Sequence, residues 1–392
     1  MSDGGRAMSV RLAHVITGLG AGGAEFMLLR LCARLVRNYQ LEVISLTSDG
    51  PLAAHLRVLG IPVVELGVRG VHDLPRGMRA LREALQAFRP DLIQTWLCHA
   101  DLLGGLVARY GLRVPVIWGV HQAEIDPRST PLSTRAVLRM CAWLSARVPT
   151  RVVSCSEAGK RARIAAGFPA GLFEVITNGV DLDLFQPRPT AGAHLRGMLG
   201  VAPDTRLVGL PARWHADKDH ALLCAAARQV LEACPATCFV LCGEGVDVGN
   251  RELLHMLEAT GHKAAFRLLG FQHDMPSLLA GLDVGVLSSR TEAFPNVIVE
   301  TMACAVPFVA TDVGDAAAII GDCGRVARPG DAADLARALL ELLAMPDAAR
   351  VALGARARER ALAHFSLAAT VEAYDALYRS VLSRGQPLCA AS

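Results

Sequence analysis

The chain has 392 residues, of which 52% are hydrophobic and 20% are charged, a composition that predicts two or three globular domains and excludes a disordered protein. Its formal net charge of +3 argues against a dedicated nucleic-acid binder. No apolar run approaches the ~20 residues that span a bilayer, and the polar N-terminus lacks a signal-peptide core, so we expect a cytoplasmic protein.

The first predicted element is a strand over residues 12–17, which a glycine-rich loop connects to a helix. The loop matches the dinucleotide-binding fingerprint by letter, with Gly18, Gly20 and Gly23 in the required places. The fingerprint also needs an acidic residue after the second strand, and Asp49 lies just past that strand. A nicotinamide- or flavin-dependent oxidoreductase is therefore one open interpretation.

Strand and helix signals then alternate as far as a strand over residues 114–121, which ends in His121. Apolar strands at 61–66 and 91–95 flank a helix at 73–89. This alternation is typical of a doubly wound α/β domain, in which ligands bind at the carboxyl ends of the strands.

A basic amphipathic segment follows over residues 128–151, where arginines alternate with apolar side chains such as Met140 and Trp143. Two interpretations fit this pattern. Such a helix can lie on an anionic membrane surface. The commoner explanation, which we favour, is a helix that packs on its own domain.

A domain boundary is predicted near Asn178-Gly179, where turn residues are followed by Pro187 and Pro189. The pair Asp181 and Asp183 lies inside this connecting segment, a position that argues against a metal-binding role. We therefore expect no metal site here.

A second strand–helix series begins with a strand over residues 207–210. Arg213 and Lys218 lie in the loop between this strand and a helix at 221–233. Two cations beside a helix N-terminus can bind phosphate. The alternative is that both are ordinary surface residues, which would show the same sequence pattern.

The most informative stretch runs from a buried strand at 283–287 into a loop and a helix that Pro295 is expected to begin. Glu292 lies in the loop and Glu300 in the helix. Backbone N–H groups at the helix start, around residues 294–297, offer an anion site. Two carboxylates that grip hydroxyls beside such a site suit a sugar nucleotide. The plainer alternative is a pair of ordinary helix carboxylates.

Seven residues separate Glu292 from Glu300. This spacing and the segment that continues through Gly314 resemble the motif of glycosyltransferase family 4, whose members are retaining enzymes with the GT-B fold. The resemblance covers nearly the whole chain. It implies an α/β protein of two facing Rossmann-like domains with an interdomain cleft. An acceptor-side domain would span 1–178, a nucleotide-sugar domain 179–364, and a helix at 365–392 would return to the first domain.

The resemblance also implies transfer of a hexosyl unit from a nucleoside-diphosphate sugar to a glycan or lipid-linked acceptor, in surface polysaccharide or glycolipid synthesis. No metal, cofactor or nucleic acid is implied, and peripheral contact with the inner membrane face is a further expectation. A protein that binds a sugar nucleotide without turnover is the non-enzymatic alternative.

Catalytic roles carry over to four residues. Arg213 and Lys218 would bind the donor diphosphate, and Glu292 would position the donor sugar. His121 would contact the transferred sugar, with a hydrogen-bonded histidine at a strand end as the alternative. No covalent nucleophile stands out.

Donor-binding roles carry over to the remaining motif residues. Glu300 would hold the ribose, and the turns that contain Glu244 and Phe271 would meet the donor and its base. The chain lacks the glutamate that usually follows the glycine at Gly314, which leaves the distal contacts open. The other expected donor contacts come from two glycines over the diphosphate and four residues beside the sugar: Gly22, Gly23, Phe294, Pro295, Asn296 and Val297.

Overall fold

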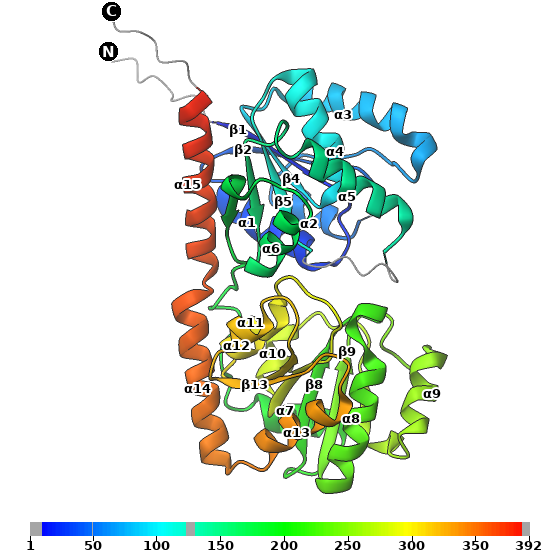
Figure 1. The fold of residues 1–392 in the computed structure, drawn as a ribbon. Helices are drawn as coiled ribbons and strands as arrows, with labels where there is room; N and C mark the ends of the chain where they lie inside the picture. Colours follow the sequence, from blue (N-terminus) through cyan, green and yellow to red (C-terminus); the bar gives the residue numbers. More distant parts are fainter. Residues whose placement is uncertain (1–9, 49, 123–129, 386–392) are drawn as a thin grey trace, which may run out of the picture. The chain divides into compact units, whose positions relative to one another are not determined.

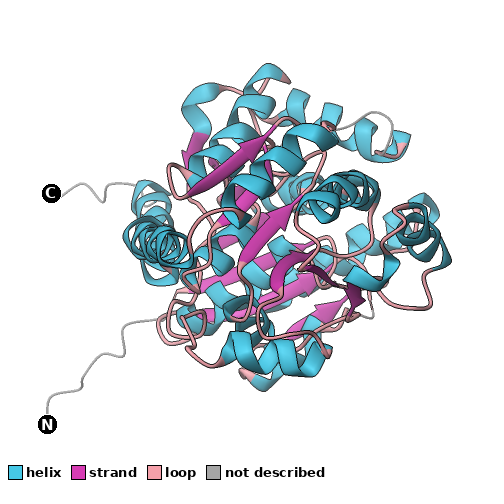
Figure 2. Cartoon of the chain, turned by 90° about the horizontal axis from the view of Figure 1, so that it is seen from below, coloured by secondary structure: helices cyan, strands magenta, loops and turns pink. Residues whose placement is uncertain are grey.

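A computed structural model describes residues 10–48, 50–122 and 130–385 (Figure 1). The chain forms two compact units, one of Met1–Gly179 with Ala368–Ser392 and the other of Val180–Leu367. The expected boundaries at 178 and 364 lie close to the observed 179 and 367. The strands lie in the interior, with helices around them (Figure 2). None of the helices in the described ranges combines the length and apolarity needed to cross a bilayer.

The first unit contains a parallel sheet of seven strands in the order β3-β2-β1-β4-β5-β6-β7. Its strands are β1 (Arg11–Ile16), β2 (Gln40–Ser45), β3 (Val63–Glu65), β4 (Leu92–Trp96), β5 (Val116–Val120), β6 (Arg151–Ser154) and β7 (Phe173–Val175). Its helices are α1 (Gly23–Leu35), α2 (Leu52–Val58), α3 (Leu74–Phe88), α4 (Cys98–Leu106), α5 (Leu132–Leu144), α6 (Glu157–Ala165) and α15 (Leu367–Gly385).

The second unit contains a parallel sheet of six strands in the order β10-β9-β8-β11-β12-β13. Its strands are β8 (Arg206–Pro211), β9 (Thr237–Cys242), β10 (Phe266–Leu268), β11 (Val284–Leu287), β12 (Phe308–Thr311) and β13 (Gly324–Ala327). Its helices are α7 (Ala191–Leu199), α8 (His220–Ala233), α9 (Arg251–Ala259), α10 (Met275–Ala280), α11 (Asn296–Ala303), α12 (Ala316–Ile320), α13 (Ala332–Leu343) and α14 (Asp347–His364).

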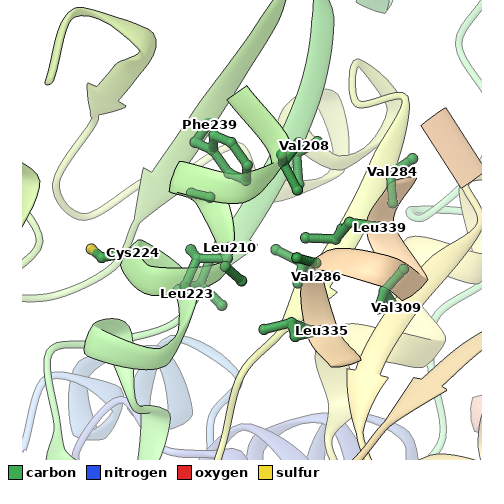
Figure 3. Close-up of a cluster of buried hydrophobic side chains, with 14 of the residues drawn as sticks. Val208, Leu210, Leu223, Cys224, Phe239, Val284, Val286, Val309, Leu335 and Leu339 are labelled. Atoms are coloured by element: carbon green, nitrogen blue, oxygen red, sulfur yellow. The ribbon is translucent and has the colours of Figure 1, made fainter. Parts of the chain in front are cut away.

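The core of the second unit lies between its sheet and the helices on one face (Figure 3). Val208 and Val286 from adjacent strands meet Leu223 of α8 and Leu339 of α13 there, all fully buried. Strands covered on both faces read as continuous apolar runs, because neither face meets water. The sequence therefore specifies these strands strongly, and they hold the loops at their ends in fixed places.

The final helix, α15, belongs to the first unit from Ala368 onward. Its Tyr374 and Tyr378 are buried. Tyr374 stacks on Trp96 with 6.1 Å between ring centroids, and the Tyr39 hydroxyl donates a 2.6 Å hydrogen bond to Asp375. The helix thus completes the core beside β4.

Candidate active site

The predicted charged residues of the second unit lie where its strand order reverses. Strand β8 is flanked by β9 on one side and by β11 on the other: the chain runs from β8 outward to β9 and β10, then crosses back to begin the other half of the sheet at β11. In open α/β sheets, ligands bind at such a switch point, beyond the carboxyl ends of the strands. Lys218 lies in the loop after β8 and Glu292 in the loop after β11.

Lys218 and Glu292 form a direct ion pair between these two loops. The ammonium contacts one carboxylate oxygen of Glu292, and the Ser289 hydroxyl donates a 2.7 Å hydrogen bond to the same oxygen. Both charged side chains are largely shielded from solvent. Such a pair keeps its geometry better than an exposed one, because water competes less for its hydrogen bonds.

Further hydrogen bonds fasten the β11 loop to the β8 loop on both sides of Lys218. The backbone N–H of Arg290 donates to the Asp217 carbonyl at 2.7 Å, and the Ser288 hydroxyl donates to the Lys218 carbonyl at 2.8 Å. The Arg290 guanidinium lies 2.6 Å from the Asp219 carboxylate. These contacts position the backbone of Lys218.

Asp219 has a second role, as the N-cap of α8, where its side chain accepts a hydrogen bond from the Leu222 N–H at 3.2 Å. Sequence reasoning missed both Asp219 and Arg290. An aspartate immediately before a helix is a recognisable cap signal. No local pattern identified its ion-pair partner, which lies 71 residues further along the chain.

The Glu292 loop is also held from the side of β12. The Thr311 hydroxyl donates a 2.6 Å hydrogen bond to the Ser289 carbonyl. Gly314 has φ of +60°, and a Cβ there would lie 2.4 Å from the Glu292 carbonyl oxygen. A glycine is required at this position by both its conformation and its surroundings. The backbone that carries Glu292 is therefore fixed by packing on Gly314.

Helix α11 begins at Asn296, one residue later than expected. Pro295 is the N-cap, with φ of −73° and ψ of 95°, and so precedes the first turn instead of starting it. Its extended ψ is what keeps it outside the helix. Within the described part of the chain, no side chain caps this helix end. The amides of residues 294–297 lie here, and Glu300 lies in the second turn.

The Phe294 side chain does not contribute to a polar site. It is buried and packs edge-on against Phe365, with 5.8 Å between ring centroids. Only its backbone could contact a ligand, as the resemblance implied.

The loops after β8, β9 and β10 are joined to one another in the same way. Gly243 has φ of +146°, and a Cβ there would lie 2.4 Å from the Ala212 carbonyl oxygen. Its N–H donates to the Gly270 carbonyl at 2.8 Å, while the Trp214 N–H donates to the Glu244 carbonyl at 2.7 Å. Three adjacent strand ends therefore present one continuous set of loops.

Arg213, Glu244 and Phe271 all lie on this set of loops, one after each strand, and all three are exposed. The Phe271 ring packs edge-on against His273, with 5.0 Å between centroids. Three predicted residues from distant parts of the sequence are thus brought to one edge of the sheet.

In the first unit, the switch point lies between β1 and β4. Gly22 is the N-cap of α1, which begins at Gly23. A Cβ on Gly22 would lie 2.4 Å from the Glu25 carboxylate, which is the end of a flexible side chain and could move aside. Asp49, the acidic residue of the dinucleotide interpretation, lies outside the described residues.

His121 follows β5 in this unit, and its ring stacks on Trp96 with 4.7 Å between centroids and 14° between planes. Both ring nitrogens are buried, and neither has a hydrogen-bond partner among the described residues. No hydrogen bond from a described residue therefore supports the alternative of a hydrogen-bonded histidine at a strand end. Burial lowers the pKa of His121 to about 4, so the ring is neutral at neutral pH. An unpaired buried nitrogen suits a ligand hydroxyl.

Two family models match the chain, one over the first sheet from β2 onward and the other over the whole second sheet. The model described as "Glycosyltransferase Family 4" matches residues 21–184. The model described as "Glycosyl transferases group 1" matches residues 205–345, which include the Lys218–Glu292 pair.

Similar proteins include EpsD of Bacillus subtilis, a provisionally named glycosyltransferase (29% identical, covering 78% of this chain and 80% of that protein). Another is the UDP-Gal:alpha-D-GlcNAc-diphosphoundecaprenol alpha-1,3-galactosyltransferase of Escherichia coli (23% identical, 71% and 73%). Among solved structures, Anabaena HepE in complex with UDP and glucose superposes with a TM-score of 0.83 (25% identical, 94% and 100%). The two matched models, these relatives and the two parallel sheets lead to one conclusion: the chain belongs to glycosyltransferase family 4 and has the GT-B fold.

Proposed function

We propose that this glycosyltransferase moves a hexosyl unit from a nucleoside-diphosphate sugar to a glycan or lipid-linked acceptor, with retention at the anomeric carbon. Two similar proteins support the donor and acceptor classes. The name of the Escherichia coli relative specifies a UDP-sugar donor and a diphosphoundecaprenol-linked acceptor. HepE was crystallised with UDP and glucose.

The observation that carries this proposal is the Lys218–Glu292 pair at the switch point, beside the N-terminus of α11. Departure of a nucleoside diphosphate builds negative charge on its phosphate oxygens. Lys218, Arg213 and the amides of residues 294–297 would stabilise that charge, since oriented donors in a shielded site stabilise it strongly. The reaction we propose therefore uses no metal ion and no cofactor.

Donor binding would exchange partners within this pair. Glu292 accepts hydrogen bonds from both Lys218 and Ser289, so its carboxylate is already oriented as an acceptor. A sugar hydroxyl can donate to the same carboxylate while the ammonium turns toward phosphate. Glu292 would then position the sugar and Lys218 would hold the leaving group.

The remaining donor contacts follow from residue chemistry. The neutral ring of His121 would accept or donate one hydrogen bond to a sugar hydroxyl, and the turn at Gly22–Gly23 would approach the diphosphate. Glu300 would hold the ribose hydroxyls. The exposed loops that carry Glu244 and Phe271 would contact the donor and its base.

The cellular setting is part of the same proposal. We infer a role in surface polysaccharide or glycolipid synthesis, in the cytoplasm at the inner membrane face. Nucleic acid is not a proposed partner.

A thermal-shift screen of UDP-, GDP- and ADP-sugars tests the donor class, because a ligand that binds only the folded protein raises its melting temperature. The selected donor is then incubated with a short lipid-linked acceptor, and NMR of the product gives the anomeric configuration. We expect retention and equal turnover with EDTA or added Mg²⁺. Specific donor binding with no transfer to any acceptor would indicate a binding protein, and an inverted product would refute the retaining assignment.

A further inference from the structure

Helix α5 is apolar on two opposite faces, and packing explains only one of them. Leu138, Cys141 and Leu144 are buried, and the helix packs on α4 through this face. Leu132, Met140 and Trp143 are 77%, 49% and 72% exposed. An amphipathic helix on its own domain normally presents polar residues outward. The sequence expectation of a helix packed on its own domain therefore accounts for half of the pattern.

The exposed apolar residues form a single row along the helix. Leu132, Ala136, Met140 and Trp143 follow one another at helical spacing, four, four and three residues apart, and all four are exposed. We call this row the outer face of α5. It belongs to one helix and so does not depend on any other element for its shape.

The charged residues of α5 and its immediate flanks are all arginines, in a stretch that lies between Asp126 and Glu157. Residues 127–156 contain five arginines and no aspartate, glutamate or lysine. Arg139 is exposed on α5 itself, and Arg147 is exposed just beyond it, with its guanidinium 5.7 Å from the centre of the Trp143 ring. Arg135 is partly buried. The remaining arginines of this stretch are Arg128, outside the described residues, and Arg151, at the start of β6.

We propose that the outer face of α5 lies on an anionic lipid surface, with Trp143 and Met140 in the interfacial region and the arginines against phosphate headgroups. Tryptophan is favoured at the boundary between acyl chains and headgroups because its ring is apolar and its N–H is polar. Arginine can lay its stem on apolar surface while its charge reaches the headgroups. Basic residues beside an apolar helix face are attracted to anionic lipid.

A second copy of this chain fits the outer face poorly. A symmetric dimer would bring each patch against itself, because such an interface uses the same surface on both subunits. The arginines would then face one another without any acidic residue of this stretch to pair with. An anionic bilayer supplies the opposite charge along the whole face, so charge complementarity favours lipid.

Cosedimentation of the full chain with vesicles tests this proposal. Vesicles of phosphatidylcholine with 30 mol% phosphatidylglycerol, a composition we choose as the probe, are compared with pure phosphatidylcholine. We expect binding to the anionic vesicles only, and weaker binding at 0.5 M salt than at 0.1 M because salt screens the attraction. Trp143 fluorescence should shift to shorter wavelength on binding, and a Trp143→Phe variant should lose this shift.

Matched variants separate the outer face from general surface effects. We expect Arg139→Gln and Arg147→Gln to weaken vesicle binding by about fivefold each. Trp143→Ser should weaken it by about tenfold, since it removes a large interfacial side chain. Met198→Ser, at an equally exposed apolar position on α7, and Arg251→Gln, at an exposed arginine on α9, should bind like the parent.

Two results would overturn the proposal. One is equal binding of parent and Trp143→Ser protein to anionic vesicles, with both proteins folded by circular dichroism. The other is a lipid-free dimer in sedimentation velocity that Trp143→Ser dissociates, which would assign the face to self-association. Because vesicle binding is measured without donor or acceptor, a failure of the proposed transfer reaction would leave this result interpretable.

Discussion

At the scale of single residues, the proposed chemistry depends on which partner Lys218 has. Without donor its charge is neutralised by Glu292, and with donor it would face phosphate. The neighbouring hydroxyl of Ser289 keeps the Glu292 carboxylate hydrogen-bonded in either case. The exchange therefore costs little, because neither charged group is left without a partner.

Loss of the Lys218 charge should affect the chemical step. We predict that Lys218→Ala lowers kcat by ~10²-fold or more, the scale seen when one charge-stabilising donor is removed. Lys263→Ala, which removes an exposed lysine paired with Glu258, is the matched control and should leave kcat unchanged. Steady-state kinetics on folded protein provide the measurement. Near-normal turnover would remove Lys218 from the mechanism.

The protonation state of His121 gives a second residue-scale prediction. Because burial lowers its pKa to about 4, His121 stays neutral at every pH above about 5. The pH profile of kcat/KM between pH 5.5 and 8 should therefore have the same shape in the parent and in His121→Asn. A step near the ordinary histidine value that disappears in the variant would show that His121 titrates there and acts as a charged group.

At the scale of elements, the site depends on loops fastened to one another. The β11 loop is joined to the β8 loop through Arg290 and to the β12 side through Thr311 and Gly314. Neither Arg290 nor Gly314 carries an assigned contact with donor. Their changes therefore test positioning separately from chemistry.

Arg290→Ala should lower kcat by about tenfold through displacement of the Lys218 backbone, on the scale of losing one charge-assisted hydrogen bond. Arg290→Lys should recover part of that activity, because it restores the charge opposite Asp219. Arg337→Ala, which breaks an exposed ion pair with Asp334 elsewhere in the same unit, is the control. Equal loss of melting temperature in both alanine variants with unchanged kcat would show that Arg290 is only structural.

Gly314→Ala should both destabilise the second unit and reduce turnover. The left-handed backbone costs an alanine about 1–2 kcal/mol, and the Cβ also meets the Glu292 carbonyl at 2.4 Å. Gly330→Ala isolates the first effect, since Gly330 has φ of +73° with nothing within 4 Å of the added Cβ. Urea unfolding and kcat are measured for both. If Gly330→Ala lost as much activity as Gly314→Ala, the contact with the Glu292 loop would be irrelevant.

At the scale of the whole molecule, buried histidines make stability depend on pH. Burial lowers the pKa of His14 to about 3 and that of His220 to about 4, as it lowers that of His121. Unfolded histidines bind protons below pH 6.5, while these folded ones do not until about pH 4 or lower. The unfolded state therefore binds more protons in that window, and stability is lost as pH falls through it.

Two carboxyls oppose this trend, Asp101 and Glu42, because burial raises the pKa of both. Burial raises the pKa of Asp101 to about 7, so its contribution falls as pH rises from 3.8 to 7. The three histidines still outweigh these two carboxyls, so stability should be lower in acid. We predict a lower melting temperature at pH 4.5 than at pH 6.5, and a smaller difference for His14→Gln, whose amide oxygen can still accept from Trp96. A melting temperature that rises toward pH 4.5 would contradict these pKa shifts.

The sequence by itself determined the alternation of strands and helices, the position of the loop motifs and the family, because buried parallel strands and glycine turns leave local patterns. It placed Arg213, Lys218, Glu244 and Glu292 in the segments that follow strands, and the structure has each of them there; the short strand before Phe271 was not predicted. It misplaced the start of α11 by one residue, because a proline fits both the cap and the first turn.

Only the tertiary structure decided which of these loops meet. Lys218 contacts Glu292, 74 residues further along the chain, because β8 and β11 are neighbours in the sheet. The sequences of the two loops do not reveal this strand order. The same holds for Arg290 with Asp219, and for the unpaired ring of His121. For α5, the sequence predicted a basic amphipathic helix, and packing on α4 decided which of its apolar side chains are buried. Local pattern reflects average burial, whereas contacts between distant segments depend on the arrangement of the whole domain.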